Sequence, residues 1–268
     1  MEKKPKISII INCHNGEKFI SQCLKSLLSQ TIKNFEIVFY DNKSTDNSKK
    51  ILKKIKDKRI KYFYSKKFLK LYAARNKAVK YSNGDYICFC DVDDLWKKNK
   101  LFEQLKLIKK NNYDFIYTNY IIKNENLNRN YLGYKKKLPN GFITQHLLND
   151  YCVGIATVMV KKTILLGNEF NPNYNIIGDF DLFLRLSQKH KFYAIQKPLV
   201  YYRIHSNNYS NNNLESYYSE IKYWIKKKSI SDQNLKFTYL KYFILKLKIK
   251  LILKNINKFF LKIFNRGM

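Results

Sequence analysis

Acidic residues are scarce in this sequence, and the short motifs by which many enzymes bind phosphate are absent. Only 20 Asp and Glu residues stand against 52 Lys and Arg residues, which gives a formal net charge of +32 at pH 7. There is no GxGxxG and no GxxxxGK[ST] pattern, which argues against a conventional dinucleotide-binding fold and against a P-loop. The patterns GxSxG and HExxH are missing too, so neither a serine hydrolase nor a zinc protease is indicated. Any bound phosphate is therefore expected to need a metal ion.

Long hydrophobic runs and paired cysteines are also missing. No stretch reaches the roughly 18 uncharged apolar residues that a membrane-spanning helix needs, and the apolar run at residues 7–11 is too short for the core of a signal peptide. We therefore expect the protein to stay on the cytoplasmic side of the membrane. The five cysteines include no CxxC pair, so we expect buried free thiols in a reducing compartment, and neither disulfides nor a zinc site.

The excess of positive charge has two interpretations. It makes nucleic acid, anionic lipid and anionic substrates the partners to consider. However, Lys, Asn, Ile, Tyr and Phe are all abundant, as they are in the product of an A/T-rich coding sequence. Much of the charge can therefore be solvated surface without a specific partner, and the composition leaves both interpretations open.

Short apolar runs alternate with helical patterns over the first part of the chain. This βα order predicts an α/β fold with a mostly parallel sheet flanked by helices, in which ligands bind beyond the carboxyl ends of the strands. The later part predicts a mixed sheet, a helix that begins near Asp179, a loop over a site at residues 124–141 and a linker at 206–213. Strands are expected at residues 7–11, 35–40, 60–64, 86–90, 115–118, 156–160 and 199–203.

The C-terminal part has its own composition. Residues 235–268 contain no acidic residue, while lysines interrupt a dense set of Leu, Ile, Phe and Tyr. A basic amphipathic helix of this kind can lie in a membrane interface, with its lysines among anionic headgroups. The alternative is a helix packed on the catalytic domain or on a partner. We expect membrane association, and we predict a catalytic domain at residues 1–212 and a basic amphipathic helical extension at 213–268.

Three carboxylates follow the predicted strand at residues 86–90, namely Asp91, Asp93 and Asp94. Like charges clustered at the end of a strand repel each other unless a cation lies among them. Hard oxygen ligands favour Mg²⁺ or Mn²⁺ over zinc, and a metal ion with open coordination positions can hold a diphosphate. This DxD motif is weak evidence alone, because acidic residues also cap the helix that follows a strand.

Two further side chains are candidates for the same edge of the sheet. Asp41 ends the second predicted strand, where its carboxylate can accept hydrogen bonds from a base or a ribose. The residues that follow it, Ser44 to Asp46, are better explained as helix caps. Arg75 lies on the third predicted helix, where it can reach a phosphate or a carboxylate of the site, and a structural ion pair is the alternative.

Several of these segments, in this order, resemble glycosyltransferase family 2, the inverting enzymes of GT-A fold. The resemblance spans about residues 6–210 and implies a GT-A (Rossmann-like) fold with a donor half at about 1–118 and an acceptor half at about 119–212. The segments that carry it in the donor half are Ile7 to Asn15, Ser26 to Thr31, Phe35 to Val38, Asp41 to Asp46, Ala74-Arg75-Asn76 and Gly84 to Asp94. The resemblance implies donor contacts from Cys13, His14, Asn15, Asp41, Arg75 and Asp91, with His14 able to stack on a pyrimidine.

Two segments of the acceptor half extend the resemblance. The run Gly178 to Leu186 resembles the family's Glu-Asp-x-Asp-Leu-x-Leu-Arg, whose first Asp generally serves as catalytic base. The resemblance therefore implies Asp179 as the base and Asp181 as the second choice, with Gly178 in place of the usual Glu. Helix capping is the other explanation for both aspartates. The run Tyr202 to Ser206 resembles the family's late Tyr-Arg-x-His and brings His205 to the metal or diphosphate.

The resemblance implies a metal-dependent inverting glycosyltransferase of hexosyltransferase type. Asp93, with Asp91 and His205, would hold Mn²⁺ or Mg²⁺ against the diphosphate of a nucleotide sugar, most commonly a UDP-sugar. The acceptor would be a glycan or glycolipid in bacterial surface polysaccharide or lipopolysaccharide biosynthesis, reached from the inner face of the cell membrane.

Two alternatives to this function stay open on the sequence. One is a nucleotidyltransferase that acts on a sugar phosphate, which would release pyrophosphate instead of a nucleoside diphosphate. The other is a non-enzymatic basic protein that binds nucleic acid. We expect no nucleic acid partner, because the basic residues concentrate in an apolar helix while the predicted cleft is acidic.

Overall fold

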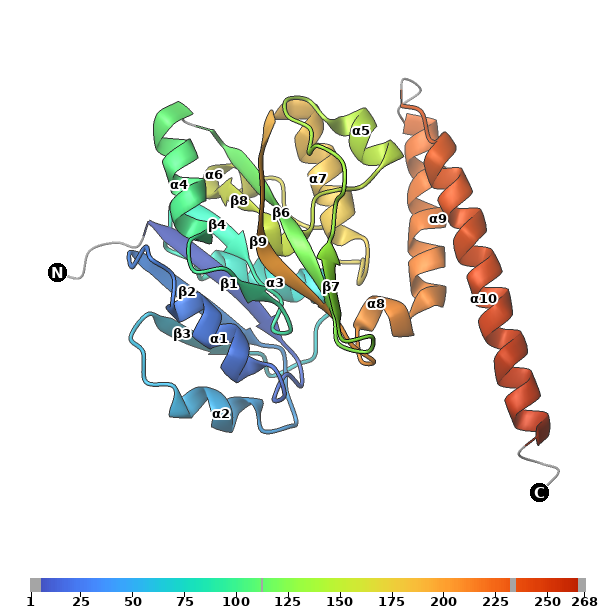
Figure 1. Ribbon diagram of the computed structural model, residues 1–268, viewed down its shortest axis with the longest axis horizontal. Coiled ribbons are helices and arrows are strands. Elements are labelled where there is room, and N and C mark those ends of the chain that lie inside the picture. The colour runs from blue at the N-terminus through green and yellow to red at the C-terminus, as the bar shows by residue number, and fades with distance from the viewer. Residues whose placement is uncertain (1–5, 112, 232–234, 265–268) are drawn as a thin grey trace. The chain divides into compact units, whose positions relative to one another are not determined.

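The computed structural model describes residues 6–111, 113–231 and 235–264. By their internal contacts, the residues form two compact units, one of residues 1–144 and 152–206 and the other of residues 145–151 and 207–268. The first unit holds a central sheet with helices, and the second is helical (Figure 1).

The first half of the sheet is parallel and consists of strands buried along their whole length. Every residue of β1 and β2 is buried, as expected of strands whose two faces are both covered by helices. Cys13 at the end of β1 pairs with Asp41 at the end of β2, so both strands deliver the following loops to the same edge. The strands lie in the order β3 (Ile60–Tyr64), β2 (Phe35–Asp41), β1 (Ile7–Cys13) and β4 (Tyr86–Phe89).

The second half of the sheet is mixed. β8 pairs antiparallel with both β4 and β6, whereas β6 and β9 run parallel to each other. This confirms the predicted mixed, mostly parallel α/β sheet. Beyond β4 the order continues with β8 (Met159–Lys161), β6 (Phe115–Asn124), β9 (Phe192–Ile204) and β5 (Leu95–Trp96), and β7 (Arg129–Leu132) pairs with β6.

Helices cover both faces of the sheet. Consecutive side chains of a strand point to opposite faces, so the apolar runs of the central strands place hydrophobic side chains on both. On one face, Ile9 and Cys88 share a core with Leu24 of α1 (Ile20–Leu28) and Leu105 of α4 (Lys100–Asn111). On the other face, α3 (Leu71–Lys80) contacts β1 and β2. The remaining helices of this unit are α2 (Ser48–Lys54), α6 (Lys162–Leu165) and α7 (Gly178–Lys189).

Three sequence-based expectations about the later elements were wrong in part. The segment 124–141 is not all loop, because Arg129–Leu132 form β7 against the far end of β6. Polar, exposed residues can occupy an edge strand when the backbone pairing satisfies their N–H and C=O groups. The strand expected at 156–160 begins only at Met159, after the 3₁₀ helix Ile155–Thr157. The expected linker contains the short helix α8 (Tyr209–Asn212).

The second unit contains a helical hairpin. Trp224 of α9 (Leu214–Ser231) contacts Phe237 with ring centroids 6.1 Å apart, and Tyr217 contacts Phe243 of α10 (Thr238–Phe264) at 5.8 Å. Because earlier residues of α9 meet later residues of α10, the two helices run antiparallel. Both helices lie within residues 213–268, where a helical extension was expected, although the sequence did not predict the bounds of α9. The side chains beyond Lys254 lie outside the described residues. Among the described residues, no helix is long and apolar enough to cross a membrane.

Candidate active site

Asp41 organises the turn that follows β2. Its Oδ1 accepts a hydrogen bond from the Ser44 backbone N–H at 2.8 Å, and its Oδ2 accepts one from the Tyr62 hydroxyl at 2.9 Å. The residue is only 1% exposed. Burial, followed by the contact with Asp41, raises the pKa of Tyr62, so the phenol stays a hydrogen-bond donor. Both oxygens of the Asp41 carboxylate therefore accept hydrogen bonds from the protein. Through these bonds Asp41 fixes the turn that borders the candidate nucleotide-sugar site.

The end of β1 carries three predicted donor-binding residues, of which Cys13 and Asn15 contact the turn after β2. The Cys13 thiol is buried and lies 3.7 Å from the Ser48 hydroxyl. Asn15 adopts a left-handed backbone with φ of 55° and accepts a hydrogen bond from the Thr45 N–H at 2.8 Å. Cys13 and Asn15 therefore join the β1 end to the turn after β2, and the Cys13 side chain is not exposed at the site.

His14 presents its ring on the surface of this edge. Its Nδ1 lies 3.0 Å from the Asn42 carbonyl, and its ring meets Phe68 edge-on with centroids 4.6 Å apart. Phe68 is 59% exposed. The two rings provide an exposed aromatic platform beside Asp41 and its turn.

The three carboxylates after β4 have three different partners. Asp91 Oδ1 accepts a hydrogen bond from the buried Arg75 guanidinium, and Asp93 Oδ2 lies 3.1 Å from His205 Nε2. Asp94 is buried and accepts a hydrogen bond from the Arg203 backbone N–H at 3.2 Å. Burial, followed by repulsion from the other two carboxylates, raises the pKa of Asp94 well above its ordinary value. Asp94 thus anchors β9, and the two predicted ligands Asp91 and Asp93 stay partly exposed.

Arg203 connects β9 to this carboxylate loop. Its Nη1 donates to Gln22 Oε1 at 2.6 Å, its Nε donates to the Asp93 backbone carbonyl, and its guanidinium lies 4.7 Å from the centre of the Phe19 ring. The Phe19 ring in turn contacts His205 with centroids 4.5 Å apart. A buried arginine therefore fixes the backbone of Asp93, and an aromatic ring supports the imidazole beside its carboxylate.

The carboxylate oxygens of Asp93 suit a hard divalent cation, and the imidazole of His205 is a borderline nitrogen ligand beside them. Among the residues that the structure describes, no three His, Cys, Asp or Glu side chains are grouped so that together they could hold a metal ion. Mg²⁺, however, is usually bound by one or two carboxylates with water and substrate phosphates completing the shell. The pair Asp93 and His205, with Asp91 close in sequence, fits that pattern of metal binding with the diphosphate as a further ligand.

Asp179 lies in the first turn of α7 and is held by a tyrosine that the sequence did not single out. The Tyr72 hydroxyl lies 2.8 Å from Asp179 Oδ1 and 3.0 Å from the Ile176 carbonyl. Burial raises the pKa of Asp179 above its ordinary value, against the opposing effect of the Arg75 charge. A carboxylate with a raised pKa is a stronger base, which is the property that proton abstraction needs.

Asp181, the second choice for the base, is buried and forms an ion pair within α7. It is 6% exposed, and its Oδ2 accepts a hydrogen bond from Arg185 Nε one turn later at 3.0 Å. Arg185 also donates to the Glu169 carbonyl at 2.8 Å. The arrangement favours Asp179 over Asp181 as the base.

The helix α3 connects the candidate base to the carboxylate loop. Arg75, which binds Asp91, lies with its guanidinium 5.0 Å from the centre of the Tyr72 ring, and Tyr72 contacts Asp179. Tyr72 and Arg75 are three residues apart and so share one face of the helix. This spacing was readable from the sequence, but the partners of Tyr72 lie more than 100 residues further along.

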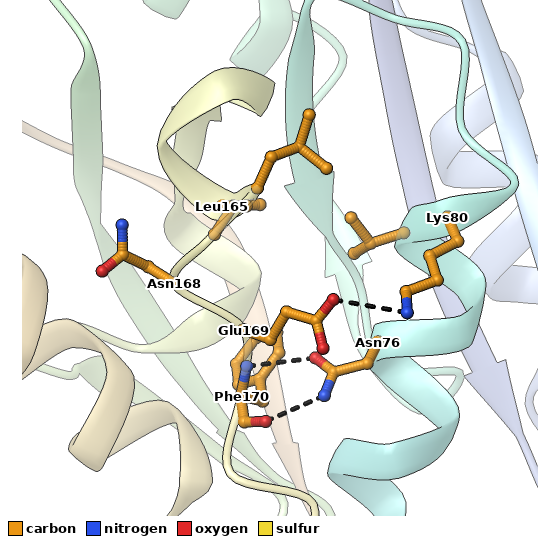
Figure 2. A pocket seen from close by; sticks show the side chains of 8 residues that line it. Asn76, Lys80, Leu165, Asn168, Glu169 and Phe170 are labelled. Atoms are coloured by element: carbon orange, nitrogen blue, oxygen red, sulfur yellow. Dashed lines mark hydrogen bonds and ion pairs between the residues drawn. The ribbon is translucent and has the colours of Figure 1, made fainter.

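Asn76, the next residue of the same motif, anchors the segment that leads to α7. Its side-chain amide donates to the Phe170 carbonyl at 2.8 Å and accepts from the Phe170 N–H at 3.0 Å (Figure 2). The pocket drawn there lies between α3 and the segment 165–170, and its lining includes none of the predicted site residues. We therefore interpret Asn76 as a support for the position of α7 and place no ligand in that pocket.

Comparison with known proteins identifies the family of the chain. The model of the glycosyl transferase family 2 matches residues 8–163, which is more than half of the chain. The chain belongs to glycosyltransferase family 2. The enzyme is 33% identical over 208 residues to the UDP-Glc:alpha-D-GlcNAc-diphosphoundecaprenol beta-1,3-glucosyltransferase WfgD of Escherichia coli, an alignment that covers 77% of the enzyme and 80% of that protein. The predicted family and enzyme class are confirmed.

Solved structures show the same fold. The crystal structure of S. aureus TarS 1-349 in complex with UDP-GlcNAc has a TM-score of 0.66 at 19% identity and covers 87% of the enzyme and 69% of that chain. The mannosyltransferase PcManGT from Pyrobaculum calidifontis, in complex with GDP-Man and Mn²⁺, has a TM-score of 0.62 at 12% identity and covers 88% of the enzyme and 67% of that chain. The GT-A fold expected from the sequence is confirmed by both.

Proposed function

We propose that the glycosyltransferase transfers a sugar from a nucleotide sugar to an acceptor hydroxyl with inversion, and that Asp179 is the base. The observation that carries the proposal is the half-buried Asp179 carboxylate in the first turn of α7. It accepts a hydrogen bond from Tyr72, and Tyr72 and Arg75 of α3 connect it to the carboxylate loop. Asp179 removes the proton of the acceptor hydroxyl while its oxygen attacks the anomeric carbon. The nucleoside diphosphate leaves from the opposite face, so the anomeric configuration inverts.

The side chains after β4 and β9 have the role of binding the diphosphate. Asp93 and His205, with Asp91, would hold a divalent cation, which supplies positive charge that stabilises the departing diphosphate. Arg203 keeps the Asp93 backbone in place, and Arg75 orients Asp91. Mn²⁺ in the mannosyltransferase neighbour supports a metal ion of this kind.

The donor proposed is a UDP-sugar. WfgD is described as using UDP-Glc, and TarS binds UDP-GlcNAc in its crystal. In this enzyme the exposed rings of His14 and Phe68 lie beside the Asp41 turn and offer a surface on which a pyrimidine can stack.

The acceptor proposed is a lipid-linked glycan of bacterial surface polysaccharide or lipopolysaccharide synthesis. WfgD is described as acting on an acceptor that carries diphosphoundecaprenol. An enzyme that modifies such an acceptor must work at a membrane surface, and we propose that it does so peripherally, on the inner face of the cell membrane.

The surface of α10 supports the proposal of membrane association. Its Leu240 and Leu247 are buried, while Leu245, Ile249 and Ile252 are each about half exposed, at 52%, 50% and 48%. At 3.6 residues per turn these three residues share one stripe on the side opposite Leu240 and Leu247. Lys241 and Lys248 border this stripe on one side, and Lys246 and Lys250 border it on the other. We call Leu245, Ile249 and Ile252 the outer stripe of α10.

Sedimentation with vesicles tests the outer stripe. Changing its three residues to Ser is expected to weaken binding to vesicles that contain anionic lipid by about 100-fold, since each buried side chain contributes on the order of 1 kcal/mol. The control changes three exposed apolar residues of the first unit, Phe102, Leu127 and Phe142, to Ser. Equal binding by both triple variants would contradict membrane association through α10. Binding to DNA instead of vesicles at physiological salt would support the nucleic-acid alternative.

Thermal stabilisation tests the donor site. A ligand at 100 times its Kd adds about 2.7 kcal/mol to the free energy of unfolding, so UDP with Mn²⁺ is expected to raise Tm while UDP alone raises it less. Asp93→Asn should remove the metal-dependent part and leave the protein folded. No response to any nucleoside diphosphate, with or without metal, would contradict the donor site.

A further inference from the structure

We propose that Tyr72 is a positioning residue that serves both protonation states of Asp179, and that Gly178 is required because its missing side chain makes room for the Tyr72 ring. The inference rests on the proposed role of Asp179 as base. It concerns side chains from two separate elements, α3 and the first turn of α7.

One hydroxyl faces two acceptors in this arrangement. Tyr72 Oη lies 2.8 Å from Asp179 Oδ1 and 3.0 Å from the Ile176 carbonyl oxygen. A phenol carries a single hydrogen and also accepts hydrogen bonds. While Asp179 is a carboxylate, the phenol hydrogen points to Oδ1 and stabilises the charge. After Asp179 has taken the acceptor proton, its own O–H can donate to Tyr72 Oη while the phenol hydrogen turns to Ile176.

In this exchange Asp179 Oδ1 receives the acceptor proton, and rotation of that hydrogen about the Cγ–Oδ1 bond turns it toward Tyr72 Oη. The exchange therefore moves no heavy atoms and conserves protons. The proton that leaves the acceptor hydroxyl stays on Asp179, and Tyr72 neither gains nor loses one. Burial raises the pKa of Tyr72 well above its ordinary value, so the phenol stays protonated throughout. Because the Tyr72 hydroxyl can bind both the charged and the neutral form of Asp179, neither group loses its hydrogen-bond partner when Asp179 gains the proton.

The ring of Tyr72 is fixed on its other sides. Tyr72 is 2% exposed, stacks on Phe170 with centroids 5.3 Å apart and carries the Arg75 guanidinium 5.0 Å from its centre. The Asn76 amide holds the Phe170 backbone. The hydroxyl therefore reaches Asp179 from a rigid support.

Gly178 lies directly against this ring. A Cβ atom at position 178 would lie 2.3 Å from Tyr72 Cδ2 and 2.4 Å from Cγ, which is closer than real Cβ contacts come. Any side chain there would push the ring away from Asp179. The glycine that replaces the Glu expected from the family resemblance is thus tied to the presence of Tyr72.

Other charged groups also act on Asp179. Arg75 on α3 favours its charged form, and Asp91 after β4 disfavours it, as does burial. The N-terminus of α7 favours the charged form through the helix dipole. Because these groups remain in a Tyr72 variant, only the hydroxyl contribution changes.

The first experiment measures kcat/KM against pH for Tyr72→Phe, which keeps the ring and loses the hydroxyl. Loss of a hydrogen bond to the charged carboxylate is expected to shift the acid limb upward by about one pH unit, so the rate below the midpoint falls about tenfold. Gly178→Ala is expected to cause a shift in the same direction although it keeps the hydroxyl. Tyr117→Phe is the matched control, because the buried Tyr117 donates its hydroxyl to the Pro139 carbonyl at 2.5 Å, outside the proposed site, and it should leave the acid limb in place.

A second measurement separates this inference from the proposed function. The original protein and Tyr72→Phe are each compared with their Asp179→Asn derivative. The difference in free energy of unfolding within each pair, measured as a function of pH, reports the pKa of Asp179 and does not depend on activity. The inference is supported if Tyr72→Phe shifts both the acid limb of kcat/KM and the pKa obtained from unfolding to higher pH. An unchanged unfolding difference overturns it. A shift in unfolding without a shift in the rate profile supports the Tyr72 contact and overturns Asp179 as the base.

Discussion

Asp179→Asn is expected to lower activity and raise stability together. Folding raises the pKa of the Asp179 carboxyl because the site is buried, although Arg75 partly offsets this effect. At a pH above both its unfolded and folded pKa values, the charged carboxylate therefore destabilises the folded protein relative to a neutral side chain. Each unit of such a shift costs about 1.4 kcal/mol. The Asn amide oxygen can still accept the Tyr72 hydrogen bond, so that contact survives the change.

The expected result is a turnover rate lower by about 10²- to 10⁴-fold and a higher free energy of unfolding at pH 7. Urea unfolding at several pH values measures the second quantity. The gain should disappear as pH falls below the ordinary carboxyl pKa, because Asp179 is then neutral in both states. Donor binding, measured by titration with UDP, should stay the same. A variant that keeps full turnover, or one that is less stable at pH 7, would refute the reasoning.

Three further changes have outcomes that follow from buried contacts. Lys100→Met should lower the free energy of unfolding at pH 7, because the buried Gln104 Oε1 loses the hydrogen bond that Lys100 Nζ donates at 2.9 Å. The loss should grow as pH rises toward the ordinary lysine pKa, because burial lowers the pKa of Lys100 and the original protein then escapes the cost of a buried charge; a variant at least as stable as the original in urea unfolding at pH 7 would contradict this. Arg203→Lys should lower both stability and metal-dependent UDP binding, since a lysine cannot bind Gln22 and the Asp93 carbonyl together; calorimetric titration showing unchanged binding would oppose it. Gly84→Ala should destabilise the sheet by at least about 2 kcal/mol, because the new Cβ would lie 2.5 Å from the Ser8 backbone nitrogen; an unchanged Tm would count against this packing.

The parallel half of the fold was predictable because its signals are local. The strands β1 and β2 are buried along their whole length, so they read as continuous apolar runs separated by helical patterns. β7 was missed because it is exposed and polar, and its partner strand supplies its hydrogen bonds. The bounds of α9 within the expected helical extension were not predicted, because its buried residues, such as Ile221 and Trp224, are interspersed with lysines and tyrosines.

The candidate site was only partly predictable. The sequence singled out Asp93, His205 and Asp179, and the first two lie together in the structure. The contribution of Tyr72 depends on a contact with a residue 107 positions away, which no local pattern reveals. For Asp41 the position at a strand end predicted a donor contact, while the hydrogen bonds that its carboxylate accepts from Ser44 and Tyr62 could not be predicted from any local pattern.

The reaction itself gives the most direct test. The enzyme would be incubated with Mn²⁺, UDP-glucose labelled with ¹³C at the anomeric carbon, and N-acetylglucosamine diphosphate carrying a short lipid, and NMR would report the anomeric configuration of the product. The account predicts release of UDP and a β-linked product from this α-linked donor, with little product from Asp179→Asn. An α-linked product would contradict direct displacement, and release of pyrophosphate in place of UDP would contradict glycosyl transfer.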